Sequence, residues 1–333
     1  METEQIIIKP EVFEESYLPE NILFRENEIK EIFSILNAFK ERGIRTNIFI
    51  YGPPGTGKTT VIKRIFEEMS SKNFACIYIN CWTCNKSHSI LSKILGFFNP
   101  FASFKRTENE LLEDILKQRE NKSCKVVVCL DEVDRLIDDS ILYTLSRNGF
   151  LLVLISNDKF ALAKLDARTK SSIMPMEIEF KEYSIEELKE IIKSRAEIGL
   201  RPNSVKETSL RMIAVASKGD ARKAISLLKT SALIAESFGK EAIDEECVAK
   251  AVKKLKDAKY EEIIQNLKKE EAVLLEIIKE HREIESKALY QEFCKRYKQI
   301  PERTFRWHIK KLVEMNVVKA KGEVRWRKYS YNL

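Results

Sequence analysis

Residues 52–59, GPPGTGKT, constrain the fold of this chain more than any other segment. They fit the pattern G-x-x-x-x-G-K-[ST], in which glycines allow a tight turn and backbone N–H groups surround a polyphosphate. An apolar strand over 47–51 precedes the loop, and a helical pattern over 60–70 follows it. We therefore expect Lys58 at the β- and γ-phosphates of a nucleotide and the hydroxyl of Thr59 at Mg²⁺.

A second strand with acidic residues at its end supports the same interpretation. Residues 126–130 read VVVCL and are followed by Asp131 and Glu132. An unbroken apolar run is typical of a parallel strand buried on both faces, and α/β sheets bind ligands at the carboxyl ends of such strands. We expect Asp131 to hold the Mg²⁺ shell and Glu132 to polarise an attacking water.

Composition and length narrow the class of protein. A chain of 333 residues with 44% hydrophobic residues is long enough for two or three domains. The longest apolar run, 150–155, is far shorter than the roughly eighteen residues of a membrane span. Seven cysteines, an odd number, fit a reducing compartment, and the C-x-x-C at 81–84 lacks a second metal-binding pair. We expect a cytoplasmic protein, associated with the nucleoid, without a membrane partner.

The excess positive charge lies at the C-terminus. Residues 301–333 contain nine Lys or Arg and three acids, interleaved with aromatic residues, which is typical of nucleic-acid binding. The pattern of helices over 270–281, 285–297 and 301–315 and a hairpin over 317–331 predicts a winged helix. Phe305, Ile309 and Leu312 should face its core. The DNA contacts that we expect are Arg303, Arg306, Trp307 and Lys310 on the third helix, and Lys321, Arg325 and Arg327 on the wing.

The remaining pattern divides the chain into domains. Strands near 46–51, 74–80, 125–131, 150–156 and 176–180 alternate with helices, which predicts an α/β core with a parallel sheet. From 184 the pattern is helical, with a capping box at Ser184 and Glu187, and helices over about 204–217, 220–237 and 244–256. The charged stretch 253–269 should lead to the third unit. We expect a nucleotide-binding core over 1–182, a helical lid over 183–258 and a DNA-binding domain over 259–333.

In their order, these motifs resemble the archaeal replication initiators, AAA+ ATPases related to origin-recognition-complex subunit one and the cell-division-cycle loader. The resemblance covers nearly the whole chain. It implies that the segment with Leu18 and Pro19 lies against adenine, that Asn157 is near the γ-phosphate, and that Arg168 acts on a neighbour's nucleotide. It also implies that Tyr183, Arg195 and Arg222 of the lid contact nucleotide, and that an insertion ending near Phe98 contributes to DNA binding. The loop residues of the nucleotide site are Pro54, Gly55, Thr56, Gly57, Lys58, Thr59 and Thr60.

The resemblance implies an ATP-controlled protein that recognises double-stranded origin DNA. Its cofactors would be ATP or ADP and Mg²⁺, and its partners the replicative helicase and paralogous initiators. Hydrolysis of ATP would be slow and would act as a switch for helicase loading. Two other functions stay open at this point: a branch-migration type of AAA+ DNA motor and an AAA+ winged-helix transcription regulator. Fold alone does not separate them.

Overall fold

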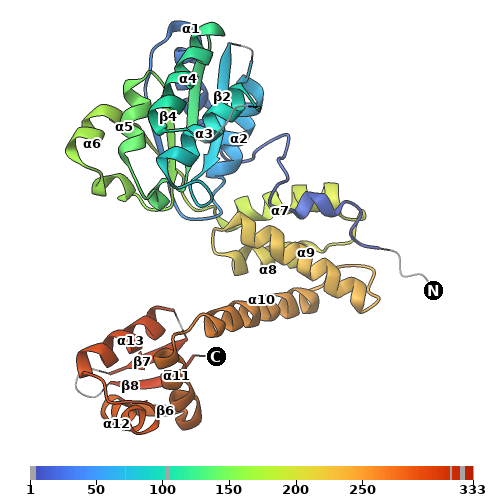
Figure 1. Ribbon diagram of the computed structural model, residues 1–333. Coiled ribbons are helices and arrows are strands. Elements are labelled where there is room, and N and C mark those ends of the chain that lie inside the picture. The colour runs from blue at the N-terminus through green and yellow to red at the C-terminus, as the bar shows by residue number, and fades with distance from the viewer. Residues whose placement is uncertain (1–4, 72, 102–105, 316, 323–326, 333) are drawn as a thin grey trace. The chain divides into compact units, whose positions relative to one another are not determined.

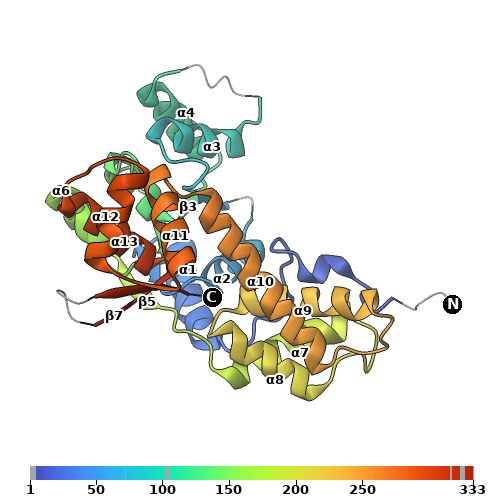
Figure 2. The same ribbon diagram turned by 90° about the horizontal axis from the view of Figure 1, so that it is seen from below.

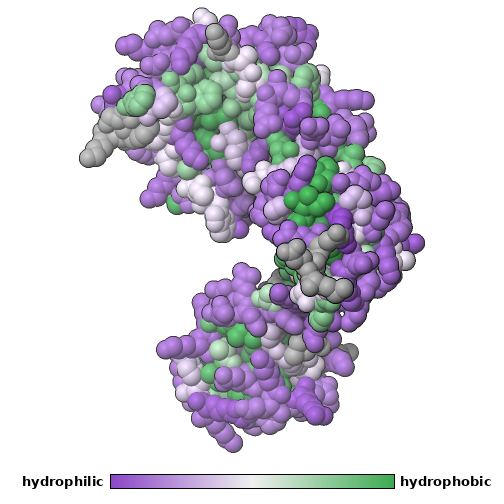
Figure 3. All heavy atoms as spheres, turned by 90° about the vertical axis from the view of Figure 1, so that its right-hand side faces the viewer, coloured by the Kyte–Doolittle hydropathy of each residue, from purple (hydrophilic) through white to green (hydrophobic). Residues whose placement is uncertain are grey.

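The computed structural model describes the whole chain except residues 1–4, 72, 102–105, 316, 323–326 and 333 (Figure 1). Two compact units divide it, Met1–Val248 and Ala249–Leu333. None of the helices in the described part of the chain has the length and apolar content that a membrane span needs. Hydrophilic side chains dominate the face of the molecule shown in Figure 3.

The first unit contains a five-stranded parallel sheet, as the sequence predicts. The strands lie in the order β2-β3-β4-β1-β5, with every neighbouring pair parallel. All residues of β1 and β4 are buried, which agrees with their unbroken apolar sequences. The strands run over Ile48–Tyr51 (β1), Phe74–Asn80 (β2), Lys125–Asp131 (β3), Leu151–Ser156 (β4) and Met176–Glu179 (β5).

Helices cover both faces of this sheet. Buried residues of α1 and α2 form a core with one face, and buried residues of α3, α4 and α5 form a second core with the other. Between β2 and β3, α3 and α4 lie side by side, where the sequence predicts an insertion (Figure 2). These helices run over Glu26–Arg42 (α1), Lys58–Met69 (α2), Ser87–Phe98 (α3), Glu108–Asn121 (α4) and Ser140–Arg147 (α5). Short 3₁₀ turns η2 (Val133–Arg135) and η3 (Ala161–Lys164) and helix α6 (Ala167–Ile173) complete the sheet's connections.

Several lysines lie at the amino edge of the sheet, where they satisfy the free carbonyls of helix ends. The Nζ of Lys125 donates to the carbonyl of Lys40 at 2.8 Å, and the Nζ of Lys40 donates to that of Met69 at 3.3 Å. Lys122 does the same for the carbonyl of Phe98 at 3.1 Å. Cations at helix C-termini stabilise the helix dipole, so these charges have a structural role.

The lid helices follow the sheet and belong to the same unit. They are α7 (Ile185–Gly199), α8 (Glu207–Ser217) and α9 (Ala221–Ser237). The predicted capping box is confirmed, because the Ser184 side chain accepts from the N–H of Glu187 and the Glu187 carboxylate accepts from the N–H of Ser184.

The N-terminal segment packs on the lid, which the sequence pattern does not predict. The N–H of Ile8 donates to the carbonyl of Gly199 at 2.8 Å, and the N–H of Ile6 donates to the carboxylate of Glu236 at 2.7 Å. The 3₁₀ turn η1 (Pro10–Phe13) continues this layer and packs on α7 and α9. The chain therefore contacts the lid before it enters the core at α1.

The C-terminal unit contains most of helix α10, three further helices and a small antiparallel sheet. Helix α10 (Glu245–Gln265) continues through most of the charged stretch that we expected to connect domains. Strand β6 (Glu283–Glu285) was not predicted; it adds to the hairpin to give the order β6-β8-β7. Phe305, Ile309 and Leu312 are buried in the core of this unit, as predicted. The other elements are α11 (Lys269–His281), α12 (Ser286–Arg296), α13 (Glu302–Glu314), β7 (Val318–Lys321) and β8 (Lys328–Tyr331).

Candidate nucleotide site and nucleic-acid interface

The turn between β1 and α2 has the backbone that a phosphate-binding loop requires. Gly55 and Gly57 have φ values of 74° and 91°, which residues with a Cβ rarely adopt. A Cβ on Gly55 would lie 1.8 Å from Oδ1 of Asp220, and one on Gly57 would lie 2.8 Å from the hydroxyl of Tyr183. Only glycine permits this close approach of the lid residues. Helix α2 begins at Lys58, so its free N–H groups and dipole are available to an anion.

Lys58 is held by neutral oxygen atoms. Its Nζ donates to the carbonyls of Gly52 and Pro53 at 2.6 and 2.8 Å, and to Oδ1 of Asn157 at 2.9 Å. Burial lowers the pKa of Lys58 to about 8, against the attraction of Asp131. The geometry therefore brings the predicted residues Lys58 and Asn157 together.

Asp131 ends β3 and is 4% exposed. Its Oδ2 accepts hydrogen bonds from the hydroxyls of Thr59 and Tyr78, both at 2.7 Å. Its Oδ1 accepts from the N–H of Glu132 at 2.9 Å. Glu132 has φ 57°, a left-handed backbone that follows directly on the strand and is uncommon for a residue with a side chain. Tyr78 is a site residue that our sequence analysis missed, although its position near the carboxyl end of β2 could have indicated it.

A cavity of about 420 Å³ lies between the sheet edge and the lid. The residues that we predicted from the loop, the strand ends and the lid all line it. They are Leu18, Pro19, Pro54, Gly55, Thr56, Gly57, Lys58, Thr59, Thr60, Asp131, Glu132, Asn157, Tyr183, Arg195 and Arg222. Tyr78 and Lys63 line it as well. Its size and its mixture of a cation, carboxylates and apolar side chains suit a nucleotide.

The lid side chains of the cavity make contacts with the N-terminal segment. Arg195 lies over the ring of Tyr17, with its guanidinium carbon 4.4 Å from the ring centroid, and donates to the carbonyl of Val12 at 3.1 Å. Arg222 forms an exposed ion pair with Glu15 at 3.3 Å. Burial lowers the pKa of Arg195. These contacts keep both arginines at the cavity.

A buried arginine, which the sequence analysis also missed as a site residue, joins the loop to the lid. Arg25 is 5% exposed. Its Nε donates to the carbonyl of Thr56 at 2.9 Å, and its Nη2 donates to that of Lys181 at 2.6 Å. Its guanidinium carbon lies 3.9 Å from the ring centroid of Tyr183. Arg25 thus fixes the start of α1, the loop and the entrance to the lid against one another.

Arg168 lies on α6, outside the residues that line the cavity. Its guanidinium carbon lies 4.4 Å from the ring centroid of Tyr143. A hydrogen bond from Arg168 lowers the pKa of the half-buried Tyr143. This position is compatible with the predicted action of Arg168 on the nucleotide of a neighbouring molecule, which stays a prediction.

The thiols near the sheet show no metal-binding arrangement among the described residues. Burial raises the pKa of Cys81 to about 12, which disfavours the thiolate that a metal needs. The one group with metal-ligand spacing in the described ranges is Glu280, His281 and Glu292. Arg296 already pairs with both of these carboxylates. This group is therefore a surface ion-pair network.

The predicted DNA-contacting residues differ in their exposure. Arg303, Arg306, Trp307 and Lys310 are exposed on α13, and Lys321 is exposed at the end of β7. Arg327 is half-buried before β8, and Arg325 lies outside the described residues. Phe98 is 7% exposed and packs in the core below the insertion. This burial argues against a DNA contact by its ring, and the exposed ring beside it is Phe97.

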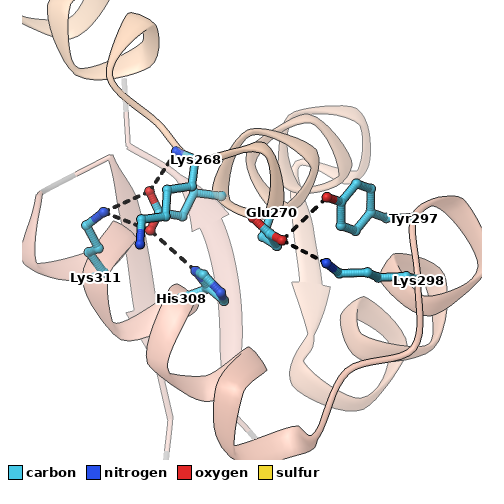
Figure 4. Close-up of polar contacts among 7 residues, drawn as sticks. Lys268, Glu270, Tyr297, Lys298, His308 and Lys311 are labelled. Carbon is cyan, nitrogen blue, oxygen red and sulfur yellow. Dashed lines mark hydrogen bonds and ion pairs between the residues drawn. The ribbon is translucent and has the colours of Figure 1, made fainter.

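A buried carboxylate, that of Glu271, fixes α13 to α11 within the C-terminal unit; Figure 4 labels its partners Lys268, His308 and Lys311. Glu271 has no exposed surface. It accepts hydrogen bonds from Nζ of Lys311 at 2.8 and 2.9 Å, and from the N–H of Lys268 at 3.1 Å. Nδ1 of His308 lies 3.3 Å from the same carboxylate. Burial would raise the pKa of Glu271, but the hydrogen bonds from Lys311 and Lys268 outweigh it and lower the pKa.

Comparisons with known proteins agree with this geometry. Residues 42–161 match the family described as the AAA domain, and residues 189–253 match the Cdc6 AAA+ ATPase-type lid domain. The ORC1-type DNA replication protein 1 of Archaeoglobus fulgidus is 33% identical over 286 residues, which cover 80% of this chain and 69% of the relative. The ORC1-type DNA replication protein 1 of Sulfolobus acidocaldarius is 33% identical over 270 residues, which cover 75% of this chain and 68% of the relative.

Solved structures show the same fold. The Aeropyrum pernix ORC1 protein, solved in complex with DNA, matches 98% of this chain and 94% of its own with a TM-score of 0.79 and 23% identity. Cdc6p of Pyrobaculum aerophilum matches 98% of this chain and 94% of its own, with a TM-score of 0.68 and 22% identity. Together with the phosphate-binding loop, the parallel sheet and the lid described above, the sequence relatives show that this chain belongs to the family of ORC1-type DNA replication proteins, with an AAA+ fold.

Proposed function

We propose that this protein is an ATP-dependent, DNA-binding initiator of replication that recognises origin DNA. One observation carries the proposal: the loop, the acidic strand end and the lid residues meet at one cavity within a chain of the ORC1 type. The protein would hydrolyse ATP slowly and use its binding and hydrolysis as a switch for helicase loading. Paralogous initiators would be further partners, and the site of action would be the nucleoid in the cytoplasm.

The residues present suit a nucleotide with Mg²⁺. Oxygen ligands are what Mg²⁺ prefers, and the hydroxyl of Thr59 and the carboxylate of Asp131 lie 2.7 Å apart at the cavity. These two residues would hold the ion, which neutralises charge on the phosphates. Lys58 would leave its carbonyl partners for the β- and γ-phosphates, with Asn157 beside it. Glu132 would accept a proton from the attacking water, and Leu18 and Pro19 would face the base.

The lid gives the switch a physical basis. Tyr183, Arg195 and Arg222 belong to the lid side of the cavity, whereas Lys58 and Asp131 belong to the sheet. A γ-phosphate that contacts both sides would favour one lid position, and its loss on hydrolysis would remove that preference. A ligand changes a conformational equilibrium only through such differential contacts. We propose 1–182, 183–258 and 259–333 as the nucleotide-binding core, the lid and the DNA-binding domain. The N-terminal segment, which packs on α7 and α9, would move with the lid.

Removal of the loop lysine tests the nucleotide site. We expect Lys58→Ala to abolish tight binding of ATP and ADP in titration calorimetry, because the main cation at the phosphates is lost. Lys164→Ala is the matched control, since Lys164 is an exposed lysine of η3 outside the cavity. Equal affinity of Lys58→Ala and the control for ATP would contradict the proposed site.

The C-terminal unit is the proposed reader of DNA. Three helices followed by a hairpin are the elements of a winged helix, in which the third helix enters the major groove. On α13, Arg303, Arg306 and Lys310 are exposed, and the ion pairs of Arg306 with Glu302 and of Lys310 with Glu314 are exposed as well. Exposed pairs of this kind contribute little, so these cations are available to phosphates and base edges.

Charge removal on α13 tests the DNA proposal. We expect the triple variant of Arg303, Arg306 and Lys310 to Ala to bind a labelled duplex more weakly, with a log–log salt slope smaller by up to about 3. The matched control removes three exposed lysines of α10, Lys253, Lys254 and Lys256, with the same change in net charge. An unchanged salt slope for the α13 variant would contradict the role of this helix.

A further inference from the structure

The hydroxyl of Tyr78 occupies an unusual position at the edge of the sheet. Tyr78 lies in β2, two residues before the strand ends, and pairs in register with Cys129 of β3. Its ring reaches toward the carboxyl end of the neighbouring strand, and its hydroxyl donates to Oδ2 of Asp131 at 2.7 Å. Nζ of Lys63 lies 4.8 Å from the centroid of the ring. A side chain from a different strand thus fixes the carboxylate at the cavity.

The three donors around Asp131 have different relations to a nucleotide. Thr59 belongs to the phosphate-binding loop, and its hydroxyl is itself a proposed ligand of Mg²⁺. The N–H of Glu132 belongs to the adjacent residue and fixes Oδ1 alone. Tyr78 is the one donor to Oδ2, among the described contacts, that is neither a proposed metal ligand nor a neighbour in sequence.

We propose that Tyr78 is a positioning residue for the Mg²⁺ site, because it orients the carboxylate of Asp131 toward the ion bound with ATP. The inference rests on the proposed function of the cavity. Hydrogen bonds to a metal-binding carboxylate fix its orientation, and their loss typically weakens metal affinity by 10–100-fold. A phenol holds the carboxylate without adding a positive charge that would repel the ion. Lys63, whose Nζ lies next to the ring, lines the cavity as well.

A purely structural role for Tyr78 is the alternative. The ring is half-buried and packs beside the core formed with α1 and α2. In that case Tyr78 would act through the packing of its ring in the core, and its hydroxyl would have no role. Tyr78→Phe separates the two roles, because it keeps the ring and removes only the oxygen atom.

The test measures the affinity for ATP at a series of MgCl₂ concentrations and in excess EDTA, without any hydrolysis. For Tyr78→Phe we expect the wild-type affinity for ATP in EDTA. The MgCl₂ concentration that gives half of the Mg²⁺-dependent gain in ATP affinity should be about tenfold higher than for the wild-type protein. Tyr290→Phe is the matched control, since Tyr290 is also half-buried, donates its hydroxyl to the carbonyl of Ile300 at 2.5 Å and lies on α12 outside the cavity. Thermal unfolding of each variant reports on the packing.

Each outcome separates the inference from the proposed function. If the wild-type protein binds ATP and Tyr78→Phe shows the wild-type dependence on MgCl₂, Tyr78 has no positioning role and the nucleotide site stands. A lower unfolding temperature of Tyr78→Phe with an unchanged MgCl₂ dependence would likewise assign the residue to packing. If the wild-type protein itself fails to bind ATP, the result contradicts the proposed function and, with it, the inference about Tyr78.

Discussion

Asp131 in the first unit and Glu271 in the second are both buried carboxylates, yet their surroundings differ in kind. Asp131 accepts from two neutral hydroxyls and one backbone N–H, and it lines a cavity. Glu271 is enclosed and is bound by the ammonium group of Lys311, with the His308 ring beside it. Burying an ionised carboxylate is costly unless it is paired. Glu271 has its cation within the fold, whereas Asp131 would receive one, Mg²⁺, in the function that we propose.

This difference separates a ligand site from a structural ion pair. Neutral donors orient a carboxylate without cancelling its charge, so an ion that enters the cavity can still be attracted to it. A contacting lysine both neutralises the charge and closes the space. The exposed Glu15, which pairs with Arg222, is a third case in which solvent already stabilises both charges. The three carboxylates should therefore respond differently to removal of their charge.

The largest effect is expected at Asp131. Asp131→Asn should reduce ATP hydrolysis at saturating MgCl₂ by at least about 100-fold, because the ion loses a charged ligand that stabilises the reacting phosphates. Glu271→Gln should leave the rate per folded molecule unchanged. Steady-state release of phosphate measures both. A similar loss of rate in the two variants would remove the distinction between the carboxylates.

Folding stability should show the reverse order. Glu271→Gln should lower the free energy of unfolding of the C-terminal unit by about 2–3 kcal/mol, because Lys311 and His308 lose their partner. Because the folded state lowers the pKa of Glu271, its stabilisation is complete above the ordinary pKa of about 4.3 and is lost as the pH falls through the folded value. Urea unfolding of the wild-type and Gln proteins at pH 7 and in acid measures this. A difference between them that is the same at both pH values would contradict it.

Lys58 should make nucleotide binding depend on pH. Its pKa is about 8 in the free protein, and phosphates beside it would raise the pKa. ATP binding at pH 8 should therefore take up about half a proton, and the affinity should fall as the pH rises above 8. Calorimetry in two buffers with different heats of ionisation detects the uptake. Lys58→Arg is the control, because Arg stays charged; an equal uptake by this variant would assign the proton to another group.

The lowered pKa of Lys58 also makes folding stability depend on pH, and here a higher pH is favourable. In the free protein the folded pKa of Lys58 lies below the value of about 10.4 in an unfolded chain, so the charged amine costs stability below pH 8. That cost decreases as the pH rises from about 8 to 10.4. Lys58→Met should lack this contribution to the pH dependence.

The smallest effect is expected for the exposed pair. Glu15→Ala should change the affinity for ATP by less than about fivefold, since exposed ion pairs are worth little. The direction should be toward tighter binding, because Arg222 is then free for the phosphates. Glu14→Ala offers a comparison, because it removes the ion pair of Glu14 with the half-buried Lys229 and leaves that of Arg222 intact. A larger effect of Glu15→Ala than of Asp131→Asn on affinity would overturn the ranking.

Local sequence signals predicted much of the fold and the residues that line the candidate nucleotide site. The loop, the apolar strand that ends in Asp131 and the capping box at Ser184 each depend on neighbouring residues, and each has the expected structure. The Phe97–Phe98 pair illustrates the limit. Two adjacent aromatic residues on a helix point in different directions, and only packing decides that Phe98 is inside.

Contacts between distant residues explain what the sequence did not predict. Glu271 meets Lys311 forty positions later, and Tyr78 meets Asp131 through the pairing of two strands. The N-terminal segment binds Gly199 and Glu236 of the lid. Strand β6 has three residues, too few for a periodic pattern. Each of these features depends on a contact between distant residues, and the sequence around either residue alone does not indicate the contact.

Thermal unfolding with and without MgATP tests the central difference between the two carboxylates most directly. A ligand that binds only the folded state raises the unfolding temperature of the unit that binds it. We predict that MgCl₂ adds to the ATP-induced rise for the first unit of the wild-type and Glu271→Gln proteins, and that Asp131→Asn loses this addition. A full Mg²⁺-dependent rise in Asp131→Asn, or its loss in Glu271→Gln, would show that the two carboxylates do not differ in this way.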